Sequence, residues 1–570
     1  MYYEELVNIY SQLEKTTKRL EKVDIISEFL KIIKKDDISK VINLLQGKVY
    51  ADWEELKLGM NERLILKAIN QATGISQEKV EELWKKKGDL GKVAEELMRN
   101  KHQTTLTRKK LTLEKVYENL RKLSEFEGEG TVNRKVSLIS ELLSNSNPDE
   151  ARHIVNTVMG DLRLGVAAGI IRDSIAKAFN KDVKEVEDNY NLSVDYGKVA
   201  ELSKEGKLEL SLIPGKPIKL MLGIKTESIE EAFESVGKPA QCEFKLDGFR
   251  LQCHYDGKEI KLFTRSMENV TKQFPDVVKY LKENVKEKNY ILDSEAAGIK
   301  NGKYTAFQSI SQRIKRKYDI ERMARDFPVE LNIFDIIYHN NESLMNEPLS
   351  KRRKILEKVI NEKKGNIVLT KKIISDDEKK VEKFYDEALK AGTEGLMIKN
   401  LESKFIPGRY VNGWVKLKPV SEPLDLVITG ATWGEGKRSD WLSSFIVSCK
   451  NGDKFLEIGR VGSGLKEKNE GVKFSELTKE LKKLIIKSSG KEVEVKPKII
   501  LEVAYEEIQK SPSYNSGFAL RFPRLRRDRT KDKGLHDVDD IEKVKILYDN
   551  QRGRNNKLHY KLPKLQNSNI

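Results

Sequence analysis

Lys245-Leu-Asp-Gly-Phe-Arg250 lies where one predicted strand, Ala240 to Lys245, ends and another, Arg250 to Tyr255, begins. The Asp and Gly at its centre favour a tight turn, which would aim the lysine away from the strand end. A lysine amine can attack a phosphoryl group once it has lost its proton, so this position suits a nucleophile. Taken alone, Lys-x-Asp-Gly is also a common surface turn, and only further motifs can separate the two interpretations.

The region around this hexapeptide has the alternating apolar pattern of short strands. Between the strands lie helical patterns such as Asp376 to Ala391. The sequence therefore predicts an α+β domain built on antiparallel sheet. The expected strands are Ala240 to Lys245, Arg250 to Tyr255, Ile260 to Phe263, Tyr290 to Asp293, Val329 to Ile337 and Trp414 to Leu417.

Regions of different character lie on either side. From Tyr3 to about Lys204 the apolar residues recur at helical spacing, with helix-start signals at Ser76, Thr112 and Asn147-Pro148. After a break at Lys418 to Pro423, further strands favour a small barrel of the five-stranded oligonucleotide-binding (OB) type. These strands are Leu424 to Thr429, Phe445 to Cys449, Phe455 to Val461 and Ile499 to Tyr505. We expect a multidomain chain with an all-α N-terminal domain (1–212), an α+β domain (213–419) and a C-terminal OB-fold β-barrel (420–570).

Composition narrows the class of protein. A chain of 570 residues is too long for one hydrophobic core. Its formal charge of +17 suits a polyanionic partner, with nucleic acid preferred to a membrane surface. No membrane-spanning apolar run or signal peptide is present, so a cytoplasmic protein is expected. The three cysteines, Cys242, Cys253 and Cys449, give neither a disulfide framework nor a four-cysteine zinc site.

Five further segments follow the lysine hexapeptide in a fixed order. They are Phe263-Thr-Arg-Ser266, Leu292-Asp-Ser-Glu295, Phe334-Asp-Ile336, Glu394-Gly-Leu-Met-Ile-Lys399 and Trp414-Val-Lys-Leu-Lys418. Together the six motifs resemble those of the covalent nucleotidyltransferase superfamily, and six matches in one order argue against chance. The resemblance implies that Lys245 is charged with AMP taken from ATP and that Asp247 shapes the turn.

The same resemblance assigns roles at the nucleotide. Arg250 and Arg265 would clamp ribose and phosphate oxygens. Phe334 would stack on adenine. Glu243 would accept a hydrogen bond from the adenine amino group, which favours ATP over GTP. Without the motifs, Arg265 could equally be a rim residue and Phe334 a core residue.

Two carboxylates and two lysines complete the expected site. Glu295 and Glu394, expected at strand ends, would contact ribose or ligate Mg²⁺, which prefers oxygen ligands. Lys416 and Lys418 alternate along a strand, so both ammonium groups would face the phosphates. Without the other motifs, the two glutamates would be interpreted as solvated surface residues. The two lysines would be interpreted as charges that keep an exposed sheet edge from aggregating.

The last motif lies far along the chain, in Ala519-Leu-Arg-Phe-Pro-Arg-Leu-Arg-Arg-Asp-Arg529. The resemblance implies that Arg521 and Arg524 orient the departing pyrophosphate; the alternative is a basic stripe for nucleic acid. The family pattern is broken after Arg529, which leaves the roles of Asp532 and Lys533 open. It is also broken at Tyr410, where relatives carry an arginine, and Arg409 is the expected substitute.

The helical region indicates which superfamily member this is. Gly160-Asp-Leu-Arg-Leu-Gly165 and Pro217-Ile-Lys-Leu-Met-Leu222 resemble the DNA-binding domain and domain junction of archaeal and eukaryotic replicative ligases. The resemblance implies an ATP-dependent DNA ligase that seals nicked duplex DNA in replication, repair and recombination. Arg163 would contact DNA phosphates, or else be an exposed helix charge. A monomer is expected, with a sliding clamp as one candidate partner.

Three alternatives stay open at this point. An RNA ligase and an mRNA capping guanylyltransferase share the lysine motif. The capping enzyme would use GTP and would not carry some 200 helical residues before the motif. A clamp on nucleic acid without catalysis is the third alternative, and it would form no covalent AMP.

Overall fold

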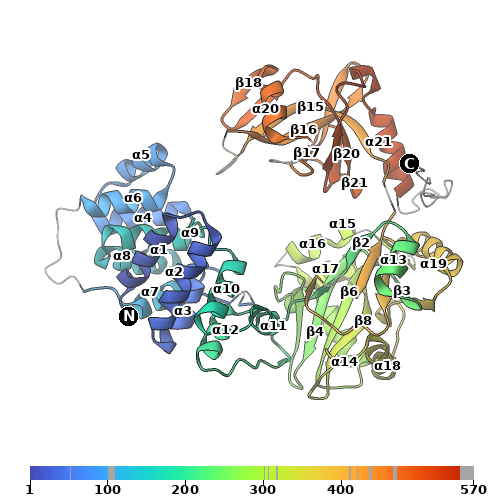
Figure 1. The fold of residues 1–570 in the computed structure, drawn as a ribbon, viewed down its shortest axis with the longest axis horizontal. Coiled ribbons are helices and arrows are strands. Elements are labelled where there is room, and N and C mark those ends of the chain that lie inside the picture. The colour runs from blue at the N-terminus through green and yellow to red at the C-terminus, as the bar shows by residue number, and fades with distance from the viewer. Residues whose placement is uncertain are drawn as a thin grey trace.

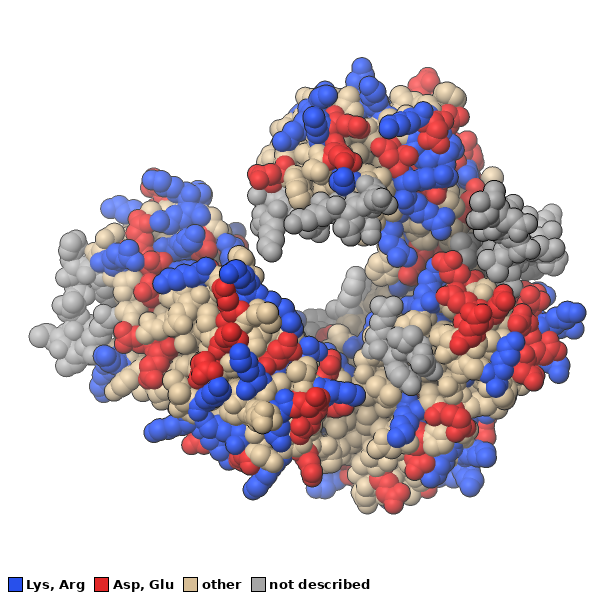
Figure 2. Space-filling view, in the orientation of Figure 1, with Lys and Arg blue, Asp and Glu red and all other residues tan. Residues whose placement is uncertain are grey.

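The computed structural model describes residues 1–51, 53–54, 56–100, 109–300, 302–305, 307–315, 319–409, 413–419, 421–434, 440–465 and 472–551. It has a helical N-terminal domain, a central α+β domain of mixed sheets, as predicted, and a β-rich C-terminal domain (Figure 1). The space-filling view shows the three domains as an open ring around a central gap (Figure 2). Among the described helices, none has the length and apolar character needed to span a bilayer.

The first domain is built from helices that bury one face each, around Tyr3, Leu6 and Tyr10 of the first helix. Thr112 and Asn147 accept hydrogen bonds from backbone amides at the starts of their helices, as the sequence predicts. Ser76 is also at a helix start, although its side chain makes no capping bond to the backbone. The helices are α1 (Tyr3–Glu14), α2 (Arg19–Ile32), α3 (Lys35–Leu45), α4 (Glu62–Thr73), α5 (Gln77–Lys87), α6 (Leu90–Arg99), α7 (Leu113–Lys122), α8 (Thr131–Asn145), α9 (Pro148–Met159), α10 (Ala168–Ala178), α11 (Val183–Ser193) and α12 (Tyr196–Lys204).

Two sheets form the central domain. One has the order β10-β8-β6-β4-β5 with β7 and β9 at its margins, and the other has the order β11-β3-β12-β14-β2. All pairs are antiparallel except β10 with β8 and β14 with β2. The strands are β2 (Ile224–Thr226), β3 (Ala240–Phe244), β4 (Gly248–Tyr255), β5 (Ile260–Thr264), β6 (Tyr290–Lys300), β7 (Lys303–Tyr304), β8 (Val329–His339), β9 (Glu342–Ser343), β10 (Ile367–Leu369), β11 (Lys372–Ser375), β12 (Leu396–Asn400) and β14 (Trp414–Leu417).

Helices cover the outer face of each sheet of this domain. Residues of α13 and α19 form a core with β3, β12 and β14, whereas residues of α14 and α18 form one with β4, β6 and β8. A short pair, β1 (Met221–Leu222) with β13 (Gly408–Arg409), lies beside them. The helices are α13 (Ile229–Val236), η1 (Thr271–Gln273), α14 (Pro275–Asn284), α15 (Phe307–Ile310), α16 (Gln312–Lys315), α17 (Ile320–Asp326), α18 (Leu349–Val359) and α19 (Glu378–Lys390).

The C-terminal domain is β-rich, as expected, with more strands than the five of a minimal OB barrel. Its main sheet has the order β17-β16-β15-β19-β18, and β15 also pairs with β20, which pairs with β23; β21 pairs with β22 separately. The elements are β15 (Leu424–Trp433), β16 (Leu442–Asn451), β17 (Lys454–Val461), α20 (Phe474–Lys482), β18 (Ile485–Ser489), β19 (Glu492–Val495), β20 (Ile500–Ala504), β21 (Glu507–Lys510), β22 (Phe518–Arg521), β23 (Arg524–Asp528), η3 (Leu535–Asp537) and α21 (Ile541–Asn550).

Two predicted positions differ from the structure. Glu295 lies within β6, which continues to Lys300, so the prediction of a strand end was wrong there. Arg163 is in the loop after α9 and has a positive φ of 52°, so it is no helix charge. In both cases periodicity predicted the element but not the residue at which it ends: β6 runs on past Glu295, and α9 ends before Arg163.

Candidate active site

A cleft of about 1280 Å³ lies between the two central sheets and reaches the C-terminal domain. Most of the residues proposed from the sequence line it. They are Glu243, Lys245, Asp247, Arg250, Arg265, Glu295, Phe334, Glu394, Lys416, Lys418, Arg521 and Arg524. Motifs that are up to about 280 positions apart in the chain therefore meet in one place.

Lys245 lies in the turn between β3 and β4. Its amide donates to the Gly395 carbonyl (2.9 Å), and the Glu394 amide donates back to the Lys245 carbonyl (2.7 Å). Its Nζ is 2.5 Å from Oε2 of Glu394, and the two side chains are 20% and 9% exposed. The nucleophile candidate is thus held by backbone and side chain against the loop that precedes β12.

Cations gather beside this lysine. Lys418 Nζ lies 3.0 Å from the same Glu394 oxygen. Burial lowers the pKa of Lys416, and the neighbouring charges of Lys418 and Lys245 lower it further. Arg265 is exposed at the end of β5 and has no ion-pair partner among the residues that the structure describes. Such a group of cations suits the phosphates of a nucleotide.

Glu295 faces the cleft from β6. Its Oε1 accepts a hydrogen bond from the Gly248 amide (3.1 Å). Burial raises the pKa of its carboxyl to about 8, although the charges of Lys245 and Arg250 oppose this. Because burial disfavours the charged form, a cation bound beside Glu295 would stabilise the carboxylate.

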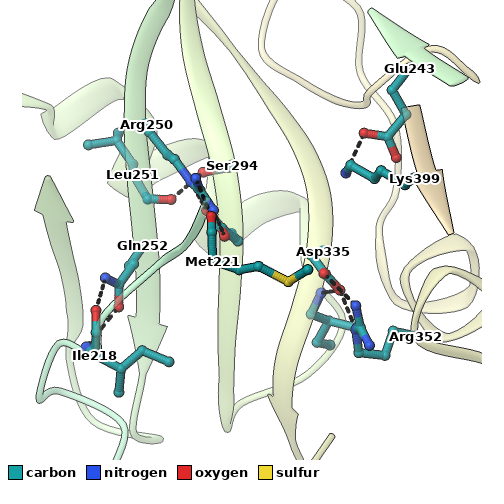
Figure 3. A network of polar contacts seen from close by, with 12 residues as sticks. Ile218, Met221, Glu243, Arg250, Leu251, Gln252, Ser294, Asp335, Arg352 and Lys399 are labelled. Carbon is teal, nitrogen blue, oxygen red and sulfur yellow. Dashed lines mark hydrogen bonds and ion pairs between the residues drawn. The ribbon is translucent and has the colours of Figure 1, made fainter. Parts of the chain in front are cut away.

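Arg250 is already engaged on two sides. Its Nε and Nη2 donate to the two oxygens of Asp293 (3.0 and 2.6 Å), and its Nη1 donates to the Met221 carbonyl (2.9 Å; Figure 3). Asp293 is fully buried. The predicted clamp is therefore rigid, with Asp293 as its partner. The Leu-Asp-Ser-Glu motif contains this aspartate, but the sequence indicated no role for it.

Two aromatic rings, those of Phe334 and Trp414, also line the cleft. Phe334 is half-buried and lies edge-on to Trp414, with centroids 6.1 Å apart. Beside them, Glu243 pairs with Lys399 (2.6 Å; Figure 3). Glu243 also accepts a hydrogen bond from the side-chain amide of Gln241 (2.6 Å), and both Glu243 and Lys399 are almost fully buried. Lys399 ends one of the motifs, yet the sequence gave no sign that it partners Glu243.

A second buried pair lies behind Phe334. The Arg352 guanidinium of α18 donates to both oxygens of Asp335 (2.7 and 2.9 Å), and neither side chain is exposed. Its Nη1 also donates to the carbonyls of Glu347 and Ser403. This pair fastens β8, and hence Phe334, to α18. The Phe-Asp-Ile motif pointed to Asp335, but no sequence signal identified Arg352.

The C-terminal domain contributes to the cleft from across the domain boundary. Arg521 ends β22 and Arg524 begins β23, and both line the cleft with Glu506. Lys418 joins the domains, because its Nζ is 3.3 Å from Glu506 and 3.0 Å from Glu394.

Several predicted residues lie elsewhere. Arg529 pairs with Glu502 (3.2 Å) and Asp532 (2.7 Å), and Lys533 pairs with Asp425, so these charges stabilise the C-terminal domain. Arg163 pairs with Asp161 and, at 3.5 Å, with Asp89.

Arg409 can be judged only in part. Its backbone pairs with Leu222, while its side chain and Tyr410 lie outside the described residues. The substitution of Arg409 for the family arginine stays a prediction. The three cysteines are buried and unpaired, as expected from their spacing.

Comparisons with known proteins agree with this architecture. Family models match in three parts: DNA ligase N terminus (1–176), ATP dependent DNA ligase domain (220–418) and ATP dependent DNA ligase C terminal region (438–533). Three such domains, with a lysine-centred cleft in the middle one, define a DNA ligase.

Similarity to individual relatives extends over the whole chain. A DNA ligase of Nanoarchaeum equitans (strain Kin4-M) is 48% identical over 564 residues, covering 97% of this chain and 99% of that protein. One of Archaeoglobus fulgidus is 41% identical and covers 96% and 98%. The chain therefore belongs to the ATP-dependent DNA ligase family. ATP is its nucleotide substrate and nicked DNA its polymer substrate, and neither an RNA ligase nor a capping enzyme is favoured.

The fold has a solved counterpart. The structure named Pmar-Lig_Pre. superposes with a TM-score of 0.56 at 17% identity, covering 92% of this chain and 99% of that one. At this identity the likeness concerns the fold alone.

Proposed function

We propose that Lys245 is the nucleophile that carries AMP in this ligase. The observation that supports this most directly is the 2.5 Å contact of its Nζ with Glu394 inside a cleft lined by cations. The amine would attack the α-phosphorus of ATP, forming an N–P bond as the bond to pyrophosphate breaks. Lys245 must give up its proton first, and its side chain, which is 20% exposed, can release that proton to solvent.

The remaining cleft residues would each bind a different part of the nucleotide. Phe334 and the Glu243–Lys399 pair would hold adenine, with Glu243 favouring its amino group. Arg250, fixed by Asp293, would hold ribose. Lys416, Lys418 and Arg265 would hold the phosphates by charge.

We also propose that Glu295 and Glu394 hold Mg²⁺. No cluster of three or more His, Cys, Asp or Glu residues suited to a metal occurs in the described ranges. Two carboxylates nevertheless fit Mg²⁺, which commonly binds through one or two carboxylates and substrate phosphates. The raised pKa of Glu295, caused by burial, also indicates a carboxyl that a cation would stabilise. Bound there, Mg²⁺ would neutralise charge on the transferred phosphoryl group.

After the first step, AMP would pass from Lys245 to the 5′ phosphate of a nick, and the 3′ hydroxyl would then displace it. Arg163 would contact duplex phosphates in this complex.

We also propose domain limits of 1–212, 213–419 and 420–570, because α12 ends at Lys204, β14 ends at Leu417 and β15 begins at Leu424. The monomeric state, the cytoplasmic location and recruitment by a sliding clamp stay predictions.

Labelling with [α-³²P]ATP tests the nucleophile. Lys245→Ala is expected to abolish covalent label yet still to seal a nick that already carries 5′ adenylate. Label should also disappear in excess EDTA and return with Mg²⁺. Lys371→Ala, which removes an exposed lysine paired with Glu387, is the matched control and should label normally. Label retained by Lys245→Ala would refute the assignment.

A further inference from the structure

The linker between the helical and central domains (residues 205–220) takes part in two hydrophobic cores. Leu208 belongs to the core of the helical domain. Leu212 and Ile218 instead belong to a cluster with Ile291 and Trp414 of the central domain. A segment with side chains in both cores is no free tether, so its conformation fixes how the two domains meet.

Polar side chains on β4 bind the backbone of this linker. The Ile218 amide donates to Gln252 Oε1 (3.1 Å), and Gln252 Nε2 donates to the Ile218 carbonyl (2.6 Å; Figure 3). The Gly215 amide donates to His254 Nδ1 (3.2 Å), so the other ring nitrogen of His254 donates to Gln252 Oε1 (3.1 Å). Gln252 and His254 have no exposed surface, and Gly215 has a φ of +92° that few other residues adopt.

A third residue on this face of β4, Arg250, lines the active-site cleft. Side chains alternate along a strand, so Arg250 shares a face of β4 with Gln252 and His254. Arg250 donates to the Met221 carbonyl, directly after the linker, and to the buried Asp293 of β6. We call Arg250, Gln252 and His254 the β4 ladder.

The other side of the linker is tied to α11 of the helical domain. The Leu210 amide donates to Asn189 Oδ1 (2.9 Å), and the Lys219 amide donates to the Asn191 carbonyl (2.9 Å). Leu192 of the same helix packs on the Ile218 cluster. The linker is thus held between α11 and β4.

We propose that Gln252 and His254 are positioning residues that set the angle between the helical domain and the nucleotide cleft. The inference rests on the proposed function, in which the helical domain holds a nick while AMP moves from Lys245. Charging of Lys245 by ATP needs no DNA and should tolerate a changed angle. Transfer of AMP to the nick and sealing require the DNA on the helical domain to be aligned with the nucleotide cleft. These two steps should therefore depend on Gln252 and His254.

Gln252→Met tests this proposal because it keeps side-chain length and burial but removes the bonds to Ile218 and His254. Spin labels at Lys86→Cys in α5 and Lys379→Cys in α19 would report the interdomain distance, since both sites are exposed and the native cysteines are buried. We expect a broader distance distribution than in the parent. AMP labelling should stay within about twofold. The KM for a 5′-adenylated nick should rise about tenfold, with kcat changed less.

His254→Leu removes only the bonds with Gly215 and Gln252, so it should give a smaller change of the same kind. It replaces Gln252→Met in the test if that variant does not fold. The matched control is Glu330→Met, which loses the bonds that the Glu330 carboxylate accepts from the Gly365 amide (2.6 Å) and the Tyr304 hydroxyl (2.7 Å), away from linker and cleft. It should leave the distance distribution and the KM unchanged.

An unchanged distance distribution in Gln252→Met, or equal losses in labelling and sealing, would overturn the positioning role. Failure of the proposed nucleophile would look different, because Lys245→Ala would then retain AMP whatever the ladder variants did.

Discussion

His153 is fully buried in the core of the helical domain, with its ring 4.8 Å from that of Tyr10. Neither ring nitrogen has a hydrogen-bond partner in the described structure. Burial, with a smaller effect of Arg152, lowers the pKa of this histidine to about 3. The unfolded chain, with a pKa near 6.5, binds the proton more readily, so stability should fall as pH drops from about 6.5 towards 3. At pH 5 the loss should be about 2 kcal/mol.

Calorimetry of wild type and His153→Phe at pH 7.5 and 5.0 checks this. The variant cannot be protonated, so its unfolding temperature should fall less on acidification. His536→Phe, at a side chain that is 82% exposed, is the control and should keep the wild-type pH response. Equal acid sensitivity of wild type and His153→Phe would contradict the expectation.

At the scale of elements, the approach of β4 to β6 sets the geometry of the cleft. A Cβ on Gly248 would lie 2.3 Å from the Ala296 carbonyl oxygen and 2.9 Å from its carbon, both backbone atoms that cannot swing aside. Gly248→Ala should therefore push β4 from β6 and displace both Lys245 and Glu295. Displacements of about 1 Å can reduce rates by about 100-fold, so AMP labelling should fall by 10- to 100-fold.

Single-turnover labelling would measure this change. Gly459→Ala in β17 is the control, since its added Cβ would meet nothing closer than 3.5 Å and should leave the rate unchanged. Near-normal labelling by Gly248→Ala would show that the strands can separate without harm to the site.

The strands were largely predictable because alternation is a local signal. Trp414–Leu417 is reproduced in full, and most others differ only at their ends. The motifs likewise predicted which side chains meet in the cleft. Their partners were not predictable, because Lys399 with Glu243 and Arg352 with Asp335 are contacts between elements far apart in the chain. Burial of such pairs depends on tertiary packing, which one sequence without relatives does not reveal.

At the scale of the whole molecule, composition predicted several domains but not how they meet. A boundary between the first two domains was expected near residue 212, yet nothing in the sequence there indicated that Gln252 and His254 would bind the linker backbone. The placement of Arg521 and Arg524 at a cleft in another domain was expected from the family resemblance alone.

From this placement across a domain boundary we predict that the C-terminal domain takes part in the first reaction step. If Arg521 and Arg524 orient the departing pyrophosphate, as the family resemblance implies, each should contribute a charge-assisted bond of about 1.5–3 kcal/mol. Arg521→Ala and Arg524→Ala should each lower AMP labelling about 10- to 100-fold. Sealing of a 5′-adenylated nick releases no pyrophosphate, so it should change only a few-fold.

The control is Arg526→Ala, which removes an exposed arginine of β23 outside the cleft and should label normally. If the two cleft variants lost both activities equally, these arginines would act through DNA binding or domain closure rather than on pyrophosphate.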